Sequence, residues 1–156
     1  MDLQTKQEIT PPSFWVNEMP IYTTYLAFLR KAKYNPLNIF PHALKETIIH
    51  YIMRNRGNND VAPDEDMLKN FMKLIKIYGI AKLWPQYEEN YLIQIGLSTK
   101  ARDWMQKTAK ESKRANVVLV CYEKDVRFCH RRLLAEEISR RYGAEYEGEL
   151  TIENIK

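Results

Sequence analysis

The sequence has few cysteines and no long apolar run. Only two cysteines occur among 156 residues, Cys121 and Cys129, so a disulfide framework of the kind that holds small secreted domains is excluded. The longest apolar runs, such as Val117 to Cys121, are too short to cross a bilayer, and the start MDLQTKQE lacks the order of a secretory signal. We therefore expect a cytoplasmic protein with free thiols and no membrane contact.

Several motifs of large enzyme classes are also missing. The chain has no glycine-rich phosphate loop, no H-E-x-x-H, no G-x-S-x-G and no dinucleotide-binding fingerprint. ATP hydrolysis, metalloproteolysis and serine hydrolysis are thereby disfavoured. With 45% hydrophobic and 28% charged residues, the composition is that of an ordinary globular protein.

The pattern of residues predicts one domain with two tails, since 156 residues are the size of a single domain. Residues 1–19 are polar at first, contain Pro11-Pro12 and end in a short apolar stretch, so we interpret them as a tail and docking segment. Residues 20–150 hold the strand and helix patterns and form the predicted domain. Residues 151–156 are a C-terminal tail.

Strands and helices alternate in the predicted domain. Ile21 to Tyr25 and residues 37–40 have the β-branched and aromatic residues of strands, and Val117 to Cys121 is typical of a strand buried on both faces. Residues 144–150 predict a charged edge strand. Helices are predicted over residues 41–54, 63–78, 85–96, 98–108 and 129–142. The expected fold class is α/β, a single helix-rich domain with about four mostly parallel strands and helices on both faces.

The segment from Asn116 to Tyr142 gathers the residues best suited to chemistry. Ligands of open α/β sheets usually bind beyond the carboxyl ends of the strands. Cys121 ends the buried strand, Glu123 follows it, and Cys129 and His130 open the next helix. These four are the candidate catalytic residues. A helix start stabilises a thiolate at Cys129, although the same position would equally bind a phosphate or carboxylate without chemistry on sulfur.

Positive charge and hydroxyl groups near these residues predict an anion as the ligand. The candidate ligand-binding residues are Arg127, Arg131, Thr23, Thr24 and Tyr25. The net charge of +4 and the basic residues within 100–114 suit phosphate or nucleic acid, although for that range taken alone a solvated helix face is the favoured interpretation. An anionic small molecule or a nucleic acid is the predicted partner, and the sequence leaves the oligomeric state open.

Each candidate also has a structural explanation. Cys121 can be an ordinary buried hydrophobe, and a histidine facing the sheet at His130 can simply bond to a backbone carbonyl. Asp125 can pair with Arg127 or Arg131. A disulfide between the two cysteines would fit a strand-to-helix loop. The spacing C-x₇-C-H has no paired knuckle, and adjacent residues on a helix diverge by about 100°, so zinc is disfavoured and no metal or cofactor is predicted.

The stretch LVCYEKDVRFCHRRLLAEEI resembles the signature of the domain-of-unknown-function family 488, in which a strand ends in Leu-x-Cys-x-Glu and a helix opens with Cys-His-Arg. The matching positions are Cys121, Glu123, Cys129, His130 and Arg131. IYTTY resembles the first strand of an archaeal-type branch, and WPQYEENYL resembles its aromatic helix. The resemblance implies an intracellular α/β domain in which these residues belong together, and it specifies no substrate.

Two functional hypotheses follow. The first is an α/β protein with a pocket for an anionic ligand, a nucleotide or a nucleic-acid phosphate, in which Arg127, Arg131 and the helix start bind the anion and Cys129 is a candidate nucleophile. The second is a non-enzymatic module that binds nucleic acid or protein and has structural cysteines. Whether the protein is an enzyme is left open by the sequence.

Overall fold

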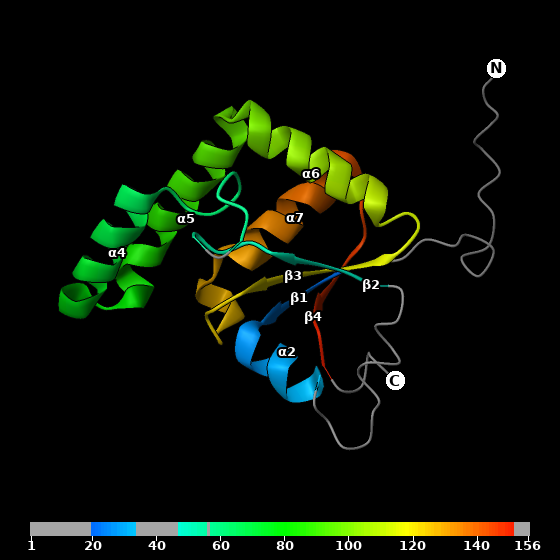
Figure 1. Ribbon diagram of the computed structural model, residues 1–156. Coiled ribbons are helices and arrows are strands. Elements are labelled where there is room, and N and C mark those ends of the chain that lie inside the picture. Colours follow the sequence, from blue (N-terminus) through cyan, green and yellow to red (C-terminus); the bar gives the residue numbers. More distant parts are fainter. Residues whose placement is uncertain (1–19, 34–46, 56, 152–156) are drawn as a thin grey trace.

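The fold is a four-stranded parallel sheet with helices on both faces (Figure 1). A computed structural model describes residues 20–33, 47–55 and 57–151. The strands are β1 (Ile21–Tyr25), β2 (Thr47–Tyr51), β3 (Asn116–Cys121) and β4 (Tyr146–Glu149). Their order across the sheet is β2-β3-β1-β4, and every neighbouring pair is parallel. The predicted α/β class is therefore confirmed.

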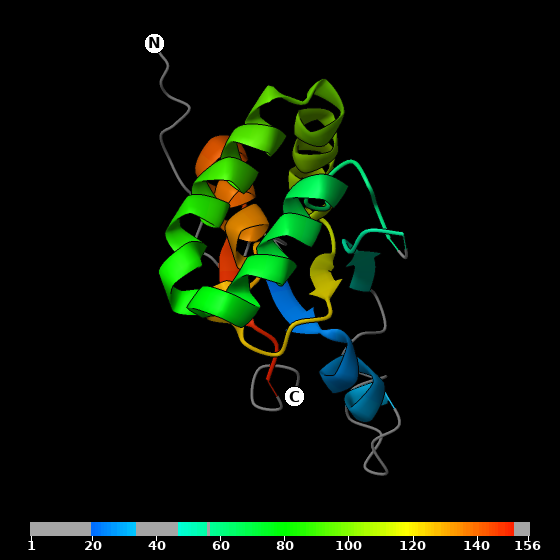
Figure 2. The ribbon, with the colours of Figure 1, turned by 90° about the vertical axis from the view of Figure 1, so that its left-hand side faces the viewer.

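The helices of the described residues divide into three groups. They are α2 (Leu26–Lys33), α4 (Glu65–Tyr78), α5 (Ile80–Leu97), α6 (Thr99–Glu111) and α7 (His130–Tyr142), with a short 3-10 helix η1 (Val126–Phe128) before α7. In Figure 1, α6 and α7 cover one face of the sheet and α2 lies on the other. Figures 1 and 2 show α4 and α5 packed side by side beyond the carboxyl ends of the strands. None of the described helices is long and apolar enough to cross a membrane.

The central strand β3 forms the middle of the core. It pairs with β2 on one side and β1 on the other, and its residues Val117 to Val120 are fully buried. Helices cover both faces of this strand, which is why its sequence is an unbroken apolar run without the alternation of a half-exposed strand. The strand predicted at Val117 to Cys121 is confirmed and is one residue longer.

The helix predicted over residues 41–54 is wrong over residues 47–54, the part that the structure describes. Thr47–Tyr51 is strand β2, in register with β3 from the pair Thr47 and Asn116 to the pair Tyr51 and Val120. The run TIIHY is β-branched and aromatic, and pairing with a buried strand outweighs the helical spacing of its apolar residues. The strand predicted at 37–40, residues 41–46 and the tail residues 1–19 and 152–156 lie outside the described residues.

The other boundaries follow local rules. Ser98 caps α6 by accepting a hydrogen bond from the backbone N–H of Ala101 at 3.1 Å. Gly143 ends α7 in the left-handed conformation with φ of 73°. The helix predicted to start at Pro85 begins five residues earlier, because Gly79, with φ of 84°, lets α5 start directly after α4.

The order of the strands places a topological switch point at the carboxyl ends of β1 and β3. β1 and β3 are neighbours, with Tyr25 paired to Cys121 at their carboxyl ends. The chain leaves β1 into α2 on one face and leaves β3 toward α7 on the other. Adjacent strands whose connections run to opposite faces form the switch point at which open α/β sheets usually bind ligands.

Gly57, in the loop after β2, is predicted to be a position where any side chain destabilises the fold. A Cβ atom there would overlap the backbone carbonyl of Tyr51 and lie 3.0 Å from the carbonyl oxygen of Met53. We expect Gly57→Ala to lower the free energy of unfolding by about 2 kcal/mol or more, because backbone atoms cannot yield as a side chain can. Urea denaturation followed by circular dichroism measures the change.

The matched control is Gly96→Ala in α5. Its added Cβ would meet only the end of the Arg141 side chain, at 3.3 Å. Alanine in a helix is favoured over glycine by about 1 kcal/mol, so this variant should be as stable as the parent or more so. Equal losses of unfolding free energy in the two variants would contradict the steric requirement for glycine at position 57.

Candidate functional site

A cavity of about 190 Å³ lies beyond the carboxyl ends of β2 and β3. Its walls are largely apolar, and four phenyl or phenol rings contribute to them: Phe71 of α4, Tyr87 of α5, Tyr122 after β3 and Phe128 of η1. Phe71 and Tyr87 are stacked, with ring centroids 3.9 Å apart and planes inclined by 21°. An apolar cavity with a few converging polar groups is the usual form of a small-molecule site.

The polar part of the cavity wall contains all four candidate catalytic residues. These are Cys121, Glu123, Cys129 and His130. Each cysteine is 2% exposed. Their sulfur atoms are in direct contact, as in a disulfide. The prediction of free thiols is therefore wrong for this structure. The two Cα atoms are 7.9 Å apart. One ring nitrogen of His130 and the two sulfur atoms lie within 4.8 Å of one another, and we call these three residues the sulfur centre.

His130 is held in one tautomer. Its Nε2 atom is 2.8 Å from the carbonyl oxygen of Ile52, just after β2. A carbonyl oxygen only accepts, so Nε2 must carry the proton and Nδ1 the lone pair of the neutral ring. The pKa of His130 is lowered to about 4, chiefly by burial; the bond to Ile52 raises it and the charge of Arg131 lowers it, each by less than burial does. The imidazole is therefore neutral near pH 7.

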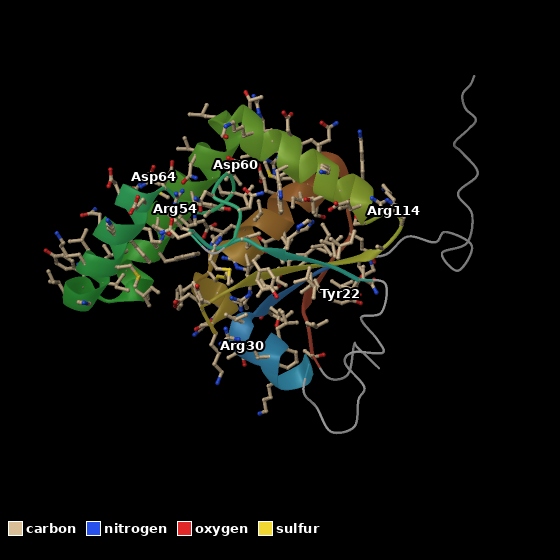
Figure 3. All side chains as sticks on the ribbon, viewed as in Figure 1. Tyr22, Arg30, Arg54, Asp60, Asp64 and Arg114 are labelled. Atoms are coloured by element: carbon tan, nitrogen blue, oxygen red, sulfur yellow. A yellow bond between two sulfur atoms is a disulfide. The ribbon has the colours of Figure 1, made fainter. Side chains whose placement is uncertain are left out.

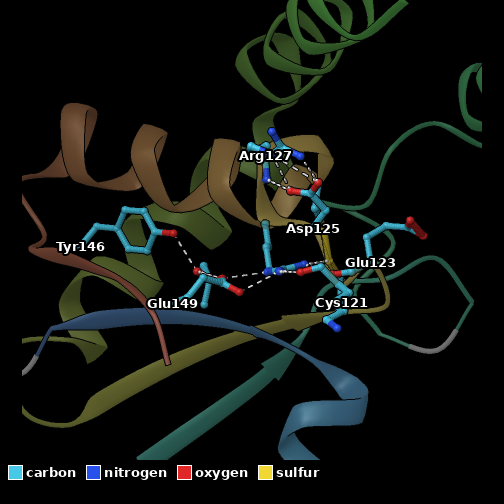
Figure 4. Close-up of polar contacts among 10 residues, drawn as sticks. Cys121, Glu123, Asp125, Arg127, Tyr146 and Glu149 are labelled. Atoms are coloured by element: carbon cyan, nitrogen blue, oxygen red, sulfur yellow. Dashed lines mark hydrogen bonds and ion pairs between the residues drawn. A yellow bond between two sulfur atoms is a disulfide. The ribbon is translucent and has the colours of Figure 1, made fainter. Parts of the chain in front are cut away.

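Arg131 is fully buried, and each of its five N–H groups has a partner (Figure 4). Nε and Nη2 donate to the two carboxylate oxygens of Glu149 at 2.9 and 2.8 Å. The other bonds go to the carbonyl oxygens of Glu123 and Lys124 and to the sulfur of Cys121, the last at 3.4 Å. The guanidinium thus joins β4, the loop after β3 and one cysteine of the sulfur centre.

The predicted ligand-binding residues of β1 do not line the cavity. Thr23 bonds through Oγ1 to the Tyr146 hydroxyl at 2.7 Å and donates to Glu149. Tyr25 lies on the same face of the strand as Thr23, whereas Thr24 lies on the opposite face. The Thr24 hydroxyl is buried and has no hydrogen-bond partner among the described residues. The structure thus brings Thr23 into the Arg131 network and separates Thr24 from it.

Arg127 does not line the cavity but lies against Phe128, which does, and we call this position the rim. Its guanidinium pairs with Asp125 at 2.7 Å and lies 5.1 Å from the ring centroid of Phe128, which lines the cavity. The hydrogen bond from Arg127 lowers the pKa of Asp125 below its usual value. The predicted pairing of Asp125 with a neighbouring arginine is confirmed. The Arg127 side chain is 75% exposed and so remains accessible from solvent.

The basic range 100–114 lies away from the cavity. It forms α6 and the turn that leads into the amino end of β3. In Figure 3, Arg114 lies at one end of the sheet, and Arg54, which contributes to the cavity wall, lies toward the other. Among the described residues that line the cavity, none comes from 100–114.

Two partners of the site were not found from the sequence. Glu149 lies 18 residues after its partner Arg131, and the carbonyl oxygen that orients His130 belongs to Ile52, 78 residues earlier. For Glu149 the one available signal was an acid on a predicted edge strand, where charge is expected anyway. For Ile52 there was none, because its backbone carbonyl carries no sequence information.

A comparison with protein families gives a match over most of the domain. The model of a family described as the active DUF488-N3 subclade matches residues 53–142, more than half of the chain. The matched range runs from the loop after β2 to the end of α7 and contains the whole sulfur centre. It does not include β1 or β4. No curated protein and no solved structure matches the chain.

Replacement by lysine is predicted to change the free energy of unfolding strongly at Arg131 and hardly at all at Arg127. Arg131→Lys keeps the charge but removes the planar fork that binds Glu149 through two bonds. We expect a loss of about 3–5 kcal/mol in the free energy of unfolding, as for a broken buried pair. Arg127→Lys, at an exposed position, should leave the unfolding free energy unchanged. Guanidinium denaturation measures both, and similar losses would contradict the buried role of Arg131.

His130 is predicted to make stability depend on pH. Because its pKa is lower in the folded chain than the unfolded value of about 6.5, its contribution is complete above pH 6.5 and is lost as the pH falls toward about 4. The loss is on the order of 3 kcal/mol. Unfolding free energies of chelator-treated protein between pH 7 and pH 4 test this. His130→Gln keeps a donor for Ile52 and should show a smaller fall over the same range, and an equal fall would refute the assignment.

Proposed function

The chain belongs to the DUF488 family, and on this premise we propose that it binds a small anionic ligand of nucleotide type in the cavity and acts on it through the sulfur centre. One observation carries the proposal. The four candidate catalytic residues come from the end of β3, the loop after it and the start of α7, and all of them line the same cavity. The family description, which calls the subclade active, supports a catalytic role.

The size and walls of the cavity favour a flat ring. Small-molecule pockets usually measure about 300–1,000 Å³, so 190 Å³ suits a group of nucleobase size rather than a whole nucleotide. The rings of Phe71, Tyr87 and Phe128 offer apolar contact to such a group. Stacking of a base on an aromatic side chain contributes about 1–3 kcal/mol. The phosphate of the ligand would then lie outside the cavity.

Arg127 and the start of α7 are the groups we assign to the phosphate. Arg127 is at the rim, and its exposed pair with Asp125 contributes little, so a phosphate can replace that partner. The first N–H groups of a helix such as α7 favour an anion through the helix dipole. Arg131 has all its donors engaged, and we therefore assign it the role of positioning Cys121 rather than that of an anion ligand.

Cys129 is the candidate nucleophile in the metal-free, reduced chain. It is the N-cap residue of α7, and its side chain makes no capping hydrogen bond. A thiol at the start of a helix is more readily deprotonated because the dipole stabilises the thiolate. Glu123 is the one carboxylate on the cavity wall among the described residues, and we assign it proton transfer.

We expect adenosine 5′-monophosphate to bind the reduced full-length chain more tightly than adenosine or inorganic phosphate, because only the monophosphate uses both the aromatic walls and the rim. Arg127→Ala should weaken binding of the monophosphate by about tenfold and leave adenosine unchanged. Phe128→Ala should weaken both. Isothermal titration calorimetry measures the affinities.

Arg140→Ala is the matched control, since Arg140 is also an exposed arginine in an ion pair, with Glu137, but lies in the last turn of α7. It should bind the monophosphate as the parent does. Failure of the monophosphate to bind, or equal effects of the two arginine variants, would refute the proposal. Tighter binding of a DNA or RNA oligonucleotide with steep salt dependence would favour the nucleic-acid module instead.

A further inference from the structure

We propose that the sulfur centre binds a zinc ion through the sulfur atoms of Cys121 and Cys129 and the Nδ1 atom of His130, with a fourth coordination position open to the cavity. The inference rests on the proposed function only for the ligand that would approach the open coordination position. The ion site itself is argued from the three residues. It replaces the expectation of no metal and no cofactor.

One ring nitrogen of His130 lies close to both sulfur atoms, which are themselves in contact until the chain is reduced. Each of the three donor atoms is within 4.8 Å of the other two. Zinc binds sulfur at about 2.3 Å and nitrogen at about 2.0–2.1 Å, so donors around a tetrahedral ion lie roughly 3.3–3.8 Å apart. Small side-chain rotations therefore suffice to place all three around one ion. Two thiolates and one imidazole form a ligand set that zinc prefers.

The backbone of Cys129 removes the objection raised by the sequence. Adjacent residues inside a helix point about 100° apart, which would separate Cys129 from His130. Cys129, however, is the N-cap of α7 and has extended backbone angles, with φ of −136° and ψ of 141°. Only His130 is in the helix. The two side chains can therefore converge on one point despite being neighbours in sequence.

The separation of the two cysteines fits a bridging ion better than a direct bond. Their Cα atoms are 7.9 Å apart, whereas disulfides usually hold Cα atoms about 4.4–6.8 Å apart. The sulfur atoms are in direct contact in the structure, and reduction of that contact would free both thiols at this Cα separation. In the reduced chain, an ion between the two sulfur atoms would suit this wide Cα separation.

The surroundings of the donors match those of bound metal ligands. Metal-binding histidines usually donate their second ring nitrogen to a carbonyl or carboxylate, and Nε2 of His130 donates to Ile52 at 2.8 Å. Arg131 donates to the sulfur of Cys121 at 3.4 Å, which stabilises negative charge on that atom. The ring of Tyr91, at 5.5 Å from the imidazole centroid, fixes the plane of His130.

Charge balance favours the ion in this buried place. Two thiolates without a counter-ion would bring two negative charges into a region where each cysteine is 2% exposed. Zinc neutralises both, and the imidazole adds none. The charge of Arg131 is already balanced by Glu149 at 2.8 Å. The loaded centre would therefore be neutral, which lowers the free-energy cost of burying it.

The open position is what links the ion to the cavity. Three protein ligands leave one position on a tetrahedral ion, as in catalytic rather than structural zinc sites. All three ligands line the cavity, so that position faces the space assigned to the ligand ring. Glu123 lines the same cavity and could take a proton from a bound water. In the loaded chain the ion, rather than free Cys129, would meet the ligand.

Cobalt substitution provides the test. The full-length chain is reduced, stripped with chelator and titrated with Co²⁺. We expect one equivalent to produce thiolate-to-cobalt charge-transfer absorption and the visible bands of a tetrahedral ion, and Zn²⁺ to displace both. Loss of a group that only hydrogen-bonds to a metal ligand weakens metal binding by roughly 10–100-fold. We expect a larger loss of Co²⁺ affinity in each of the variants that remove a ligand: Cys121→Ser, Cys129→Ser and His130→Gln. Circular dichroism checks that each variant is folded.

His50→Gln is the matched control. His50 is a partly exposed histidine that bonds to Glu111 at 2.8 Å and lies outside the sulfur centre. The variant should bind Co²⁺ as the parent does. Absence of thiolate absorption in the reduced chain, or equal binding by the folded cysteine variants, would overturn the zinc site.

The two proposals fail separately. Calorimetry with adenosine 5′-monophosphate is run on both stripped and zinc-loaded protein. Zinc binding without nucleotide binding would support the ion site and refute the proposed ligand. Nucleotide binding to the stripped chain without any cobalt signal would refute the ion site and leave Cys129 as the reactive group.

Discussion

The buried guanidinium of Arg131 is the constraint on which the candidate site depends. It is completely enclosed, it takes both carboxylate oxygens of Glu149, and it donates to Cys121 and to the loop that follows β3. A buried cation is tolerated only when each of its donors has a partner, so these contacts have to form together. The same contacts tie the edge strand β4 to the carboxyl end of β3 and set the position of one sulfur.

The topology of the sheet explains why this network lies beside a cavity. β1 and β3 send the chain to opposite faces, so their carboxyl ends have no connection crossing directly above them. The helices α4 and α5 extend past that end and bring aromatic side chains over it (Figures 1 and 2). The result is an apolar enclosure with its sulfur, nitrogen and carboxylate groups on one wall. In such an arrangement the apolar walls can bind a ring while the groups of the polar wall act on it.

Much of the fold was accessible from local pattern. The buried run at Val117, the capping serine Ser98 and the left-handed Gly143 each act through their own chain neighbours, so the sequence determines them. β2 was not accessible in this way. The spacing of its apolar residues fits a helix, and its pairing with β3 depends on residues more than 60 positions away. Periodicity contains no information about such partners.

The sequence alone determined that Cys121, Glu123, Cys129 and His130 fall at the end of a strand and the start of a helix, because strand and helix patterns are local. Only the tertiary structure decided which of their neighbours face them. It placed Glu149 on Arg131, set Ile52 behind His130, and left Arg127 at the rim while burying Arg131. Two arginines four residues apart have the same chemistry, and burial within the fold gives them different roles.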